Sequence, residues 1–268
     1  MEIIWLALFA VLLLGYFALE GFDIGLGMML PVLTRASLRA GVPGTPQGHR
    51  DRLVAAMAPF VLANEVWLVA IAGTLVGAFP ALEGKVLSGL YPVVVTLLVS
   101  WIVRDAALWF RRRIDEVSWR SFWDAALCAG SWGLALSWGV ALASVLRGLP
   151  AQPFDLPGLL CGAVVAAAFA HHGRSFVTWR FSGRSETAAA GRRLLLSAAV
   201  AALPAATAFA LIVPSLLVHA APPATLNVLS IIALPVTPIL VGAQVWVWRT
   251  FGPARSAGAA AARIPSFF

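Results

Sequence analysis

Seven apolar stretches, each long enough to cross a lipid bilayer, account for most of this sequence. They cover residues 3–34, 53–80, 84–110, 122–147, 156–180, 193–219 and 225–250. A helix needs about 20 apolar residues to span the hydrocarbon layer. The chain is 60% hydrophobic and only 12% charged. It is therefore predicted to be an all-α integral membrane protein, an up-and-down bundle of about seven transmembrane helices in one domain, residues 1–252.

Basic residues gather in alternate connections between these stretches. Seventeen arginines follow the odd-numbered stretches, whereas only Lys85 and Arg147 follow the even-numbered ones. Because membrane proteins keep Lys and Arg on the cytoplasmic side, this distribution predicts an N-terminus outside and a C-terminus in the cytoplasm. Residues 253–268 are then expected to form a loose cytoplasmic tail. The same rule accounts for the net charge of +7 without a nucleic-acid partner.

The outward connections are short. Between the second and third stretches, residues 80–84 leave room only for a tight reversal. Such a reversal predicts that these two spans are antiparallel neighbours, as in other bundles with short loops.

Ionisable side chains inside the spans are few, and burial in lipid makes each a candidate functional group. Glu20 and Asp23 lie three residues apart, on one face and near the middle of the first span. Asn64 and Glu65 fall at a similar depth in the second span. Three carboxyls at one depth on neighbouring helices suit a proton relay. They also suit a polar core that only fixes helix packing, and both interpretations stay open.

Small residues near these carboxyls predict close helix packing. Gly21, Gly25 and Gly27 lie on the first span, and residues 163–170 and 197–209 are rich in alanine. In lipid, helices associate through such faces because their backbones can approach one another.

Two further polar pairs inside the spans have plainer interpretations. Arg104 and Asp105 lie near the inner end of the third span and indicate an interfacial charge pair. His171 and His172 are the only imidazoles within a span, and a transmembrane histidine can bind haem iron. No second histidine is expected opposite them, so a structural, hydrogen-bonding role is favoured. The residues indicate no haem ligands, no metal site and no catalytic motif.

Several motifs, taken in order along the chain, resemble subunit II of the cytochrome bd quinol oxidases. They are Gly21-Phe22-Asp23-Ile24-Gly25-Leu26-Gly27-Met28, Ala58-Pro59, Asn64-Glu65-Val66-Trp67-Leu68, Phe79-Pro80, Ser88-Gly89-Leu90-Tyr91, Trp119-Arg120-Ser121-Phe122-Trp123-Asp124, Gly130-Ser131, His172-Gly173 and Thr225-Leu226-Asn227-Val228. The resemblance covers essentially the whole chain and is most specific in its first 125 residues.

The resemblance implies a heterodimer in the bacterial cytoplasmic membrane. Its haem-bearing subunit I would carry haems b and d, oxidise quinol and reduce oxygen to water. This chain would be the non-haem partner, with no haem or metal of its own. Members of the family can also hold a structural quinone and associate with a small accessory subunit. Subunit II supports subunit I and, by similarity, provides a proton path from the cytoplasm.

Three departures from the family pattern bear on that path. The family usually carries an acid on the second span where this chain has Leu62, and another acidic position is Trp109 here. Subunit II is also normally longer, and a helix pair is missing near residues 182–195. Two alternatives therefore stay open: a diverged paralogue without an oxidase role, and a secondary transporter or channel using the mid-membrane carboxyls. The second lacks clear inverted repeats.

Overall fold

The computed structural model describes residues 1–183 and 185–253, and every regular element in these ranges is a helix. In chain order they are α1 (Glu2–Arg39), α2 (Pro46–Ala78), α3 (Pro80–Gly89), α4 (Tyr91–Phe110), α5 (Val117–Leu146), α6 (Leu156–Arg180), α7 (Thr187–Val218) and α8 (Pro223–Phe251). All but α3 are long and apolar enough to cross a membrane. The predicted all-α membrane fold with seven spans is confirmed. The predicted tail, beyond residue 253, lies outside the described residues.

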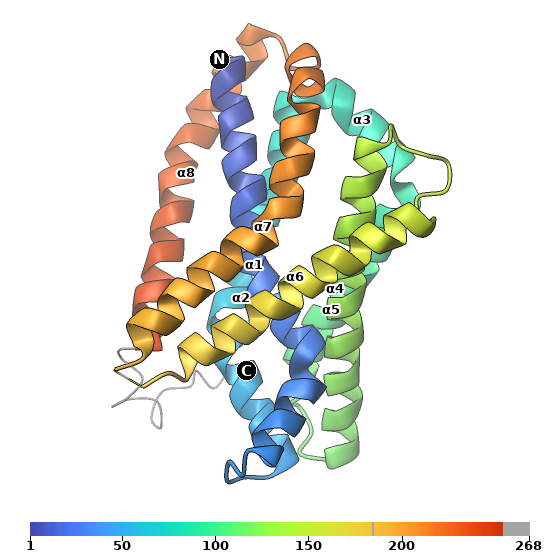
Figure 1. Cartoon of the computed structure of the whole chain (residues 1–268). Coiled ribbons are helices and arrows are strands. Elements are labelled where there is room, and N and C mark those ends of the chain that lie inside the picture. Colours follow the sequence, from blue (N-terminus) through green and yellow to red (C-terminus); the bar gives the residue numbers. More distant parts are fainter. Residues whose placement is uncertain (184, 254–268) are drawn as a thin grey trace.

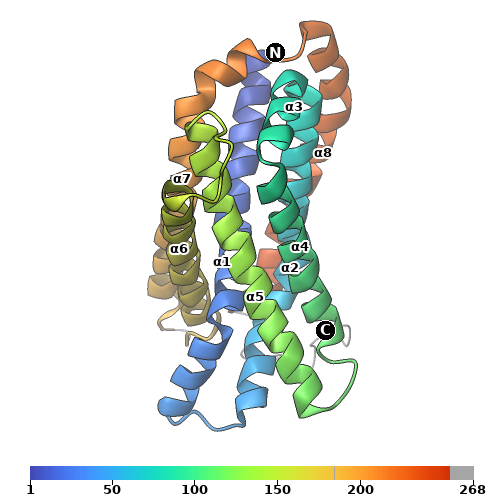
Figure 2. The same cartoon turned by 90° about the vertical axis from the view of Figure 1, so that its right-hand side faces the viewer.

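The long helices run up and down around a central α1 (Figures 1 and 2). Helix α1 packs against α2, α5, α6 and α7, while α4 packs along α5 and α8 along α2. The connections α1–α2, α4–α5 and α6–α7, which have arginines within them or in the adjoining helix ends, all lie toward one end of the bundle, and the N-terminus lies at the other. This arrangement fits the charge pattern, while the side of the membrane that each end faces stays a prediction.

The connection between the second and third spans is not the tight reversal predicted at residues 80–84. Helix α2 ends at Ala78, and Pro80 opens the separate ten-residue helix α3. Pro92, in the first turn of α4, then accompanies a second helix start. Proline favours the first turn of a helix because its fixed φ suits that position and its missing N–H is not needed there. The third span is therefore α4 alone, and it packs chiefly against α5.

Backbones of α1 and α6 cross in direct contact at glycine. A Cβ atom on Gly25 would lie 1.8 Å from the backbone oxygen of Phe169. One on Gly173 of α6 would lie 2.4 Å from a backbone nitrogen of α1. At Gly21 and Gly27 an added Cβ would meet side chains at 2.9 and 2.2 Å. The close packing predicted from these glycines is confirmed, and it fixes the height of α1 and of its two carboxyls.

Candidate functional site

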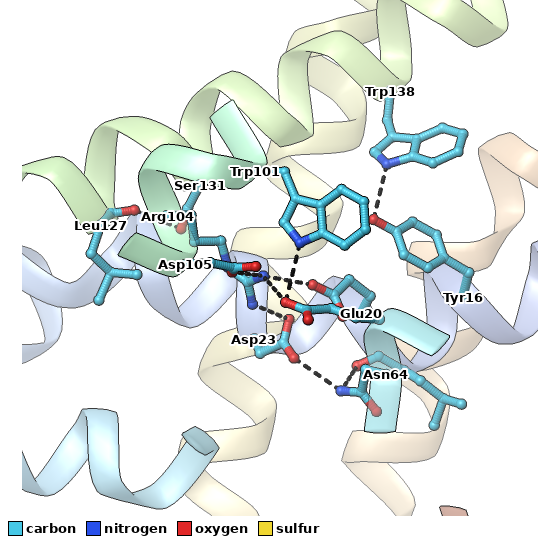
Figure 3. Close-up of polar contacts among 12 residues, drawn as sticks. Tyr16, Glu20, Asp23, Asn64, Trp101, Arg104, Asp105, Leu127, Ser131 and Trp138 are labelled. Carbon is cyan, nitrogen blue, oxygen red and sulfur yellow. Dashed lines mark hydrogen bonds and ion pairs between the residues drawn. The ribbon is translucent and has the colours of Figure 1, made fainter. Parts of the chain in front are cut away.

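One arginine lies at the centre of the candidate site. Arg104 of α4 has a side chain that is 0% exposed, and its Nη1 donates to Glu20 Oε1 at 2.8 Å. Its Nη2 donates to Asp23 Oδ1 at 3.0 Å. Nη1 also lies 3.4 Å from Glu65 Oε1 and 3.5 Å from Asp105 Oδ1. We call these five residues the central cluster (Figure 3).

The central cluster holds more carboxyls than cations. Four carboxyls, from α1, α2 and α4, surround one guanidinium, and the side chains of Glu20 and Asp23 are 2% and 0% exposed. Glu65 and Asp105 are 12% and 29% exposed and lie toward the edge of the cluster. One guanidinium balances one carboxylate, and an unpaired charge is costly in such surroundings. The other carboxyls must therefore bind protons or face a cation from outside the chain.

One atom of the cluster is available to a proton. Glu20 Oε2 is buried and has no hydrogen-bond partner among the described residues, and the same holds for Arg104 Nε. A carboxyl that keeps one oxygen free while the other accepts from the guanidinium can take up and release a proton at the free oxygen while that hydrogen bond stays in place. The arrangement thus has the chemistry that a proton relay requires.

Neighbouring side chains orient two of the carboxyls. Asn64 Nδ2 donates to Asp23 Oδ2 and to the carbonyl of Leu19, both at 2.9 Å. Trp101 of α4 donates from Nε1 to Glu65 Oε1 at 3.2 Å. Because each contacted carboxylate oxygen accepts a hydrogen bond from a fixed donor, the two groups are held toward Arg104 rather than free to rotate.

The structure brings together all four residues that the sequence marked as the buried polar group: Glu20, Asp23, Asn64 and Glu65. It places Arg104 differently from the prediction, because this side chain is fully buried and not interfacial. Arg104 lies six residues before the end of α4, which puts it about 9 Å inside the helix end. This distance from the helix end was the feature of the sequence that could have predicted the burial of Arg104. Asp105, beside it, is partly exposed.

The two histidines of α6 separate. His171 is exposed, whereas His172 is 1% exposed. His172 Nε2 donates to the carbonyl of Ala18 at 2.9 Å, and its Nδ1 lies 2.8 Å from the hydroxyl of Ser197. Since both ring nitrogens are engaged, His172 does not fit the role of a haem ligand. Within residues 1–183 and 185–253, no three His, Cys, Asp or Glu side chains are grouped to hold a metal ion.

A second charged group lies at the arginine-rich end of the bundle, where α4 ends and α2 and α5 begin. Arg111, 1% exposed, donates to Asp124 at 2.7 Å and to Asp51 at 2.9 Å. Two further arginines pair with the same aspartates at 3.3 Å each, and one of them pairs with a third aspartate at 2.7 Å. We call this group the end cluster; it comprises Arg50, Asp51, Arg111, Asp115, Arg120 and Asp124.

Sequence comparison identifies the family to which this helical bundle belongs. The family described as cytochrome bd terminal oxidase subunit II matches residues 1–221. The chain belongs to this family. The match includes every residue of the central and end clusters, and it ends before α8.

Comparison with individual proteins supports the same family assignment. The cytochrome bd ubiquinol oxidase subunit 2 of Bacillus subtilis is 32% identical over 191 residues, which are 67% of this chain and 54% of that protein. The cytochrome bd-I ubiquinol oxidase subunit 2 of Escherichia coli K12 is 29% identical over 229 residues, 79% of this chain and 56% of that protein. A probable cytochrome oxidase subunit 2 of Haemophilus influenzae is 30% identical over 192 residues, 66% and 48%. The chain spans about half the length of these curated relatives.

Proposed function

We propose that this chain is the non-haem subunit of a bd-type terminal oxidase in the bacterial cytoplasmic membrane. In this proposal a haem-bearing partner, subunit I, oxidises quinol and reduces oxygen to water, and the present chain supports it. Family membership supports the proposal, as do the names of the relatives. The basic connections at one end support an orientation with the N-terminus outside and that end in the cytoplasm.

Reduction of oxygen to water consumes protons, and the central cluster supports a role for this chain in supplying them. The observation that carries this role is the excess of four carboxyls over one guanidinium in a buried site. Glu20 Oε2 is free of hydrogen bonds among the described residues. Glu65 and Asp105, at the partly exposed edge, would exchange protons with whatever covers them. Arg104 would hold the four carboxyls at fixed distances while protons move between them.

The two positions at which family members usually carry acids do not enter this cluster. Leu62 is 54% exposed and Trp109 is 41% exposed, so both side chains lie on the outer surface of the bundle. A proton path through this chain would therefore rest on Glu20, Asp23 and Glu65. The departures from the family pattern at these two positions remove no member of the central cluster.

Purification in mild detergent tests the oxidase assignment. We expect the tagged chain to bring down a larger helical protein and a visible haem spectrum, and mass analysis would also show whether a quinone or a small accessory subunit accompanies them. A folded chain that is colourless and without a partner would contradict the assignment. It would instead support the diverged paralogue or the transporter.

Substitution in the purified complex tests the proton role. Glu20→Gln keeps the shape and removes the titrating group, and we expect quinol-dependent oxygen consumption to fall by at least about tenfold with an unchanged haem spectrum. Asp51→Asn, in the charge-balanced end cluster, is the matched control and should retain most of the activity. Full activity in Glu20→Gln and in Asp23→Asn would show that protons do not pass through the central cluster.

A further inference from the structure

Three hydrogen bonds in series join four side chains and connect α8, the last of the described helices, to the central cluster. Trp67 of α2 donates from Nε1 to Gln244 Oε1 at 3.2 Å. Gln244 of α8 donates from Nε2 to Asn64 Oδ1 at 2.8 Å. Asn64 in turn donates to Asp23 Oδ2 at 2.9 Å. The four residues are between 0% and 7% exposed, so this series of hydrogen bonds runs entirely through the protein interior.

The direction of these hydrogen bonds is fixed from both ends. The indole N–H of Trp67 can only donate, so the atom of Gln244 that faces it must be the oxygen. The amide nitrogen of Gln244 then faces Asn64, whose oxygen must accept. At the other end Asn64 contacts the carbonyl of Leu19, which can only accept, so its nitrogen faces that carbonyl and Asp23. No amide in this series can be flipped without setting two donors or two acceptors against each other.

We propose that Gln244 is a positioning residue for Asp23. By accepting from Trp67 and donating to Asn64, it holds the Asn64 amide so that its N–H always points at the Asp23 carboxyl. Without Gln244, Asn64 Oδ1 is buried with no partner, and the amide gains by turning away to find one. This inference rests on the proposed function, since it assigns to Gln244 the tuning of one carboxyl in the proposed proton path.

Nothing in the family match assigns a role to this residue, because the matched region ends at residue 221. Gln244 is the single Asn or Gln between residues 228 and 251, in a helix that is otherwise apolar at that depth. An amide is costly in such a helix unless both its donor and its acceptor are satisfied. The two hydrogen bonds satisfy them, and each goes to a residue of α2.

Infrared titration of the purified complex tests the proposal, with Asp23→Asn used to assign the Asp23 carboxyl band. In Gln244→Met, which keeps the length of the side chain and removes both hydrogen bonds, Asp23 loses a fixed donor to its carboxylate. We expect its band to titrate about 0.5 to 1 pH unit higher. Oxygen consumption measured against pH should show the same shift. The limb of this pH profile that disappears in Asp23→Asn should move by the same amount in Gln244→Met. Trp67→Phe, which frees Gln244 to rotate, should give a smaller shift in the same direction.

Ser230→Ala is the matched control on the same helix. Ser230 is 7% exposed and accepts a hydrogen bond from Trp5 Nε1 at 3.1 Å, so its substitution removes an interhelical hydrogen bond of α8 at another site. A Ser230→Ala variant that shifts the Asp23 band as much as Gln244→Met overturns the proposal, and so does an unmoved band in both Gln244→Met and Trp67→Phe. A band that shifts while the oxygen-consumption profile stays fixed upholds the positioning role and contradicts the proton path.

Discussion

The central and end clusters both surround a fully buried arginine, and they differ in charge balance. Arg104 faces four carboxyls alone, whereas the end cluster sets three arginines against three aspartates. Removal of one charge from the end cluster leaves others of the same sign nearby. Removal of Arg104 leaves the carboxyls of the central cluster with no cation among the described residues.

This difference separates two uses of charge in one bundle. A balanced network at a helix end holds α2, α4 and α5 together and has no carboxyl left over to carry a proton. An unbalanced group at mid-depth must bind protons or meet a cation from outside the chain to remain buried, and either requirement is costly for folding.

The largest effect is expected from Arg104→Met, which should lower the free energy of unfolding by about 3–5 kcal/mol because it leaves buried carboxyls without a cation. Thermal unfolding in detergent, followed by circular dichroism, measures it. Arg111→Met is the matched variant, and its loss should be clearly smaller because Arg50 and Arg120 still face Asp124 and Asp51. Equal losses in the two variants would mean that charge balance does not distinguish the clusters.

A second prediction separates packing from charge. Gly25→Ala places a methyl group against the backbone of Phe169 and should cost about 1–3 kcal/mol. It displaces α1, which carries two carboxyls of the central cluster and none of the end cluster. Gly73→Ala is the control, since its Cβ would meet nothing within 4 Å. If unfolding of the two variants were indistinguishable, the backbone contact at Gly25 would not hold α1 in place.

Salt should act on one cluster only. Asp51 is 25% exposed, and loss of its pairs with Arg111 and Arg120 in Asp51→Asn should cost about 0.5–1 kcal/mol at low ionic strength. At about 1 M NaCl, where the Debye length is about 3 Å, this difference should shrink. The destabilisation in Arg104→Met should change little because the Arg104 side chain itself is 0% exposed. A salt-sensitive Arg104→Met would show that the central cluster is open to solvent.

The smallest effect is expected at an exposed pair outside both clusters. Arg147 and the backbone N–H of Gly158 donate to Asp155, and these hydrogen bonds lower the pKa of its carboxyl. A lowered folded-state pKa stabilises the fold above the unfolded value of about 3.9, and this stabilisation is lost as the pH falls through the folded value. Asp155→Asn should therefore melt slightly below the unsubstituted chain at pH 7, and the two should converge as the pH falls through the lowered pKa of the Asp155 carboxyl. If the difference in melting temperature between the two proteins widened at acid pH, the pKa of Asp155 would not be lowered by folding.

The sequence was sufficient to predict the seven spans and the grouping of Glu20, Asp23 and Glu65, because both follow from helix geometry. Apolar length sets the spans, and a spacing of three residues puts two carboxyls on one face. It did not reveal α3, since a short helix between two prolines has the same composition as a turn.

The sequence also did not reveal the cation of the site. Arg104 lies among many arginines near span ends, where charge pairs at the membrane surface are common. Its burial depends on carboxyls that α1 and α2 bring to it in the folded bundle. Gln244 was missed for a related reason, because a neutral amide gives no signal of its own until its partners on α2 are known. Both residues acquire their roles from contacts between helices far apart in the chain.

The order in which these contacts arise has a consequence for biosynthesis. Synthesis proceeds from the N-terminus, so α1 and α2 enter the membrane with three carboxyls before the guanidinium of Arg104 has been made. Until α4 arrives, the nascent chain must keep these groups protonated or sheltered by the insertion machinery. The amide oxygen of Asn64 gains its hydrogen-bond donor later still, because Gln244 lies on α8, the last of the described helices. The site is thus finished only when the last described span has been inserted.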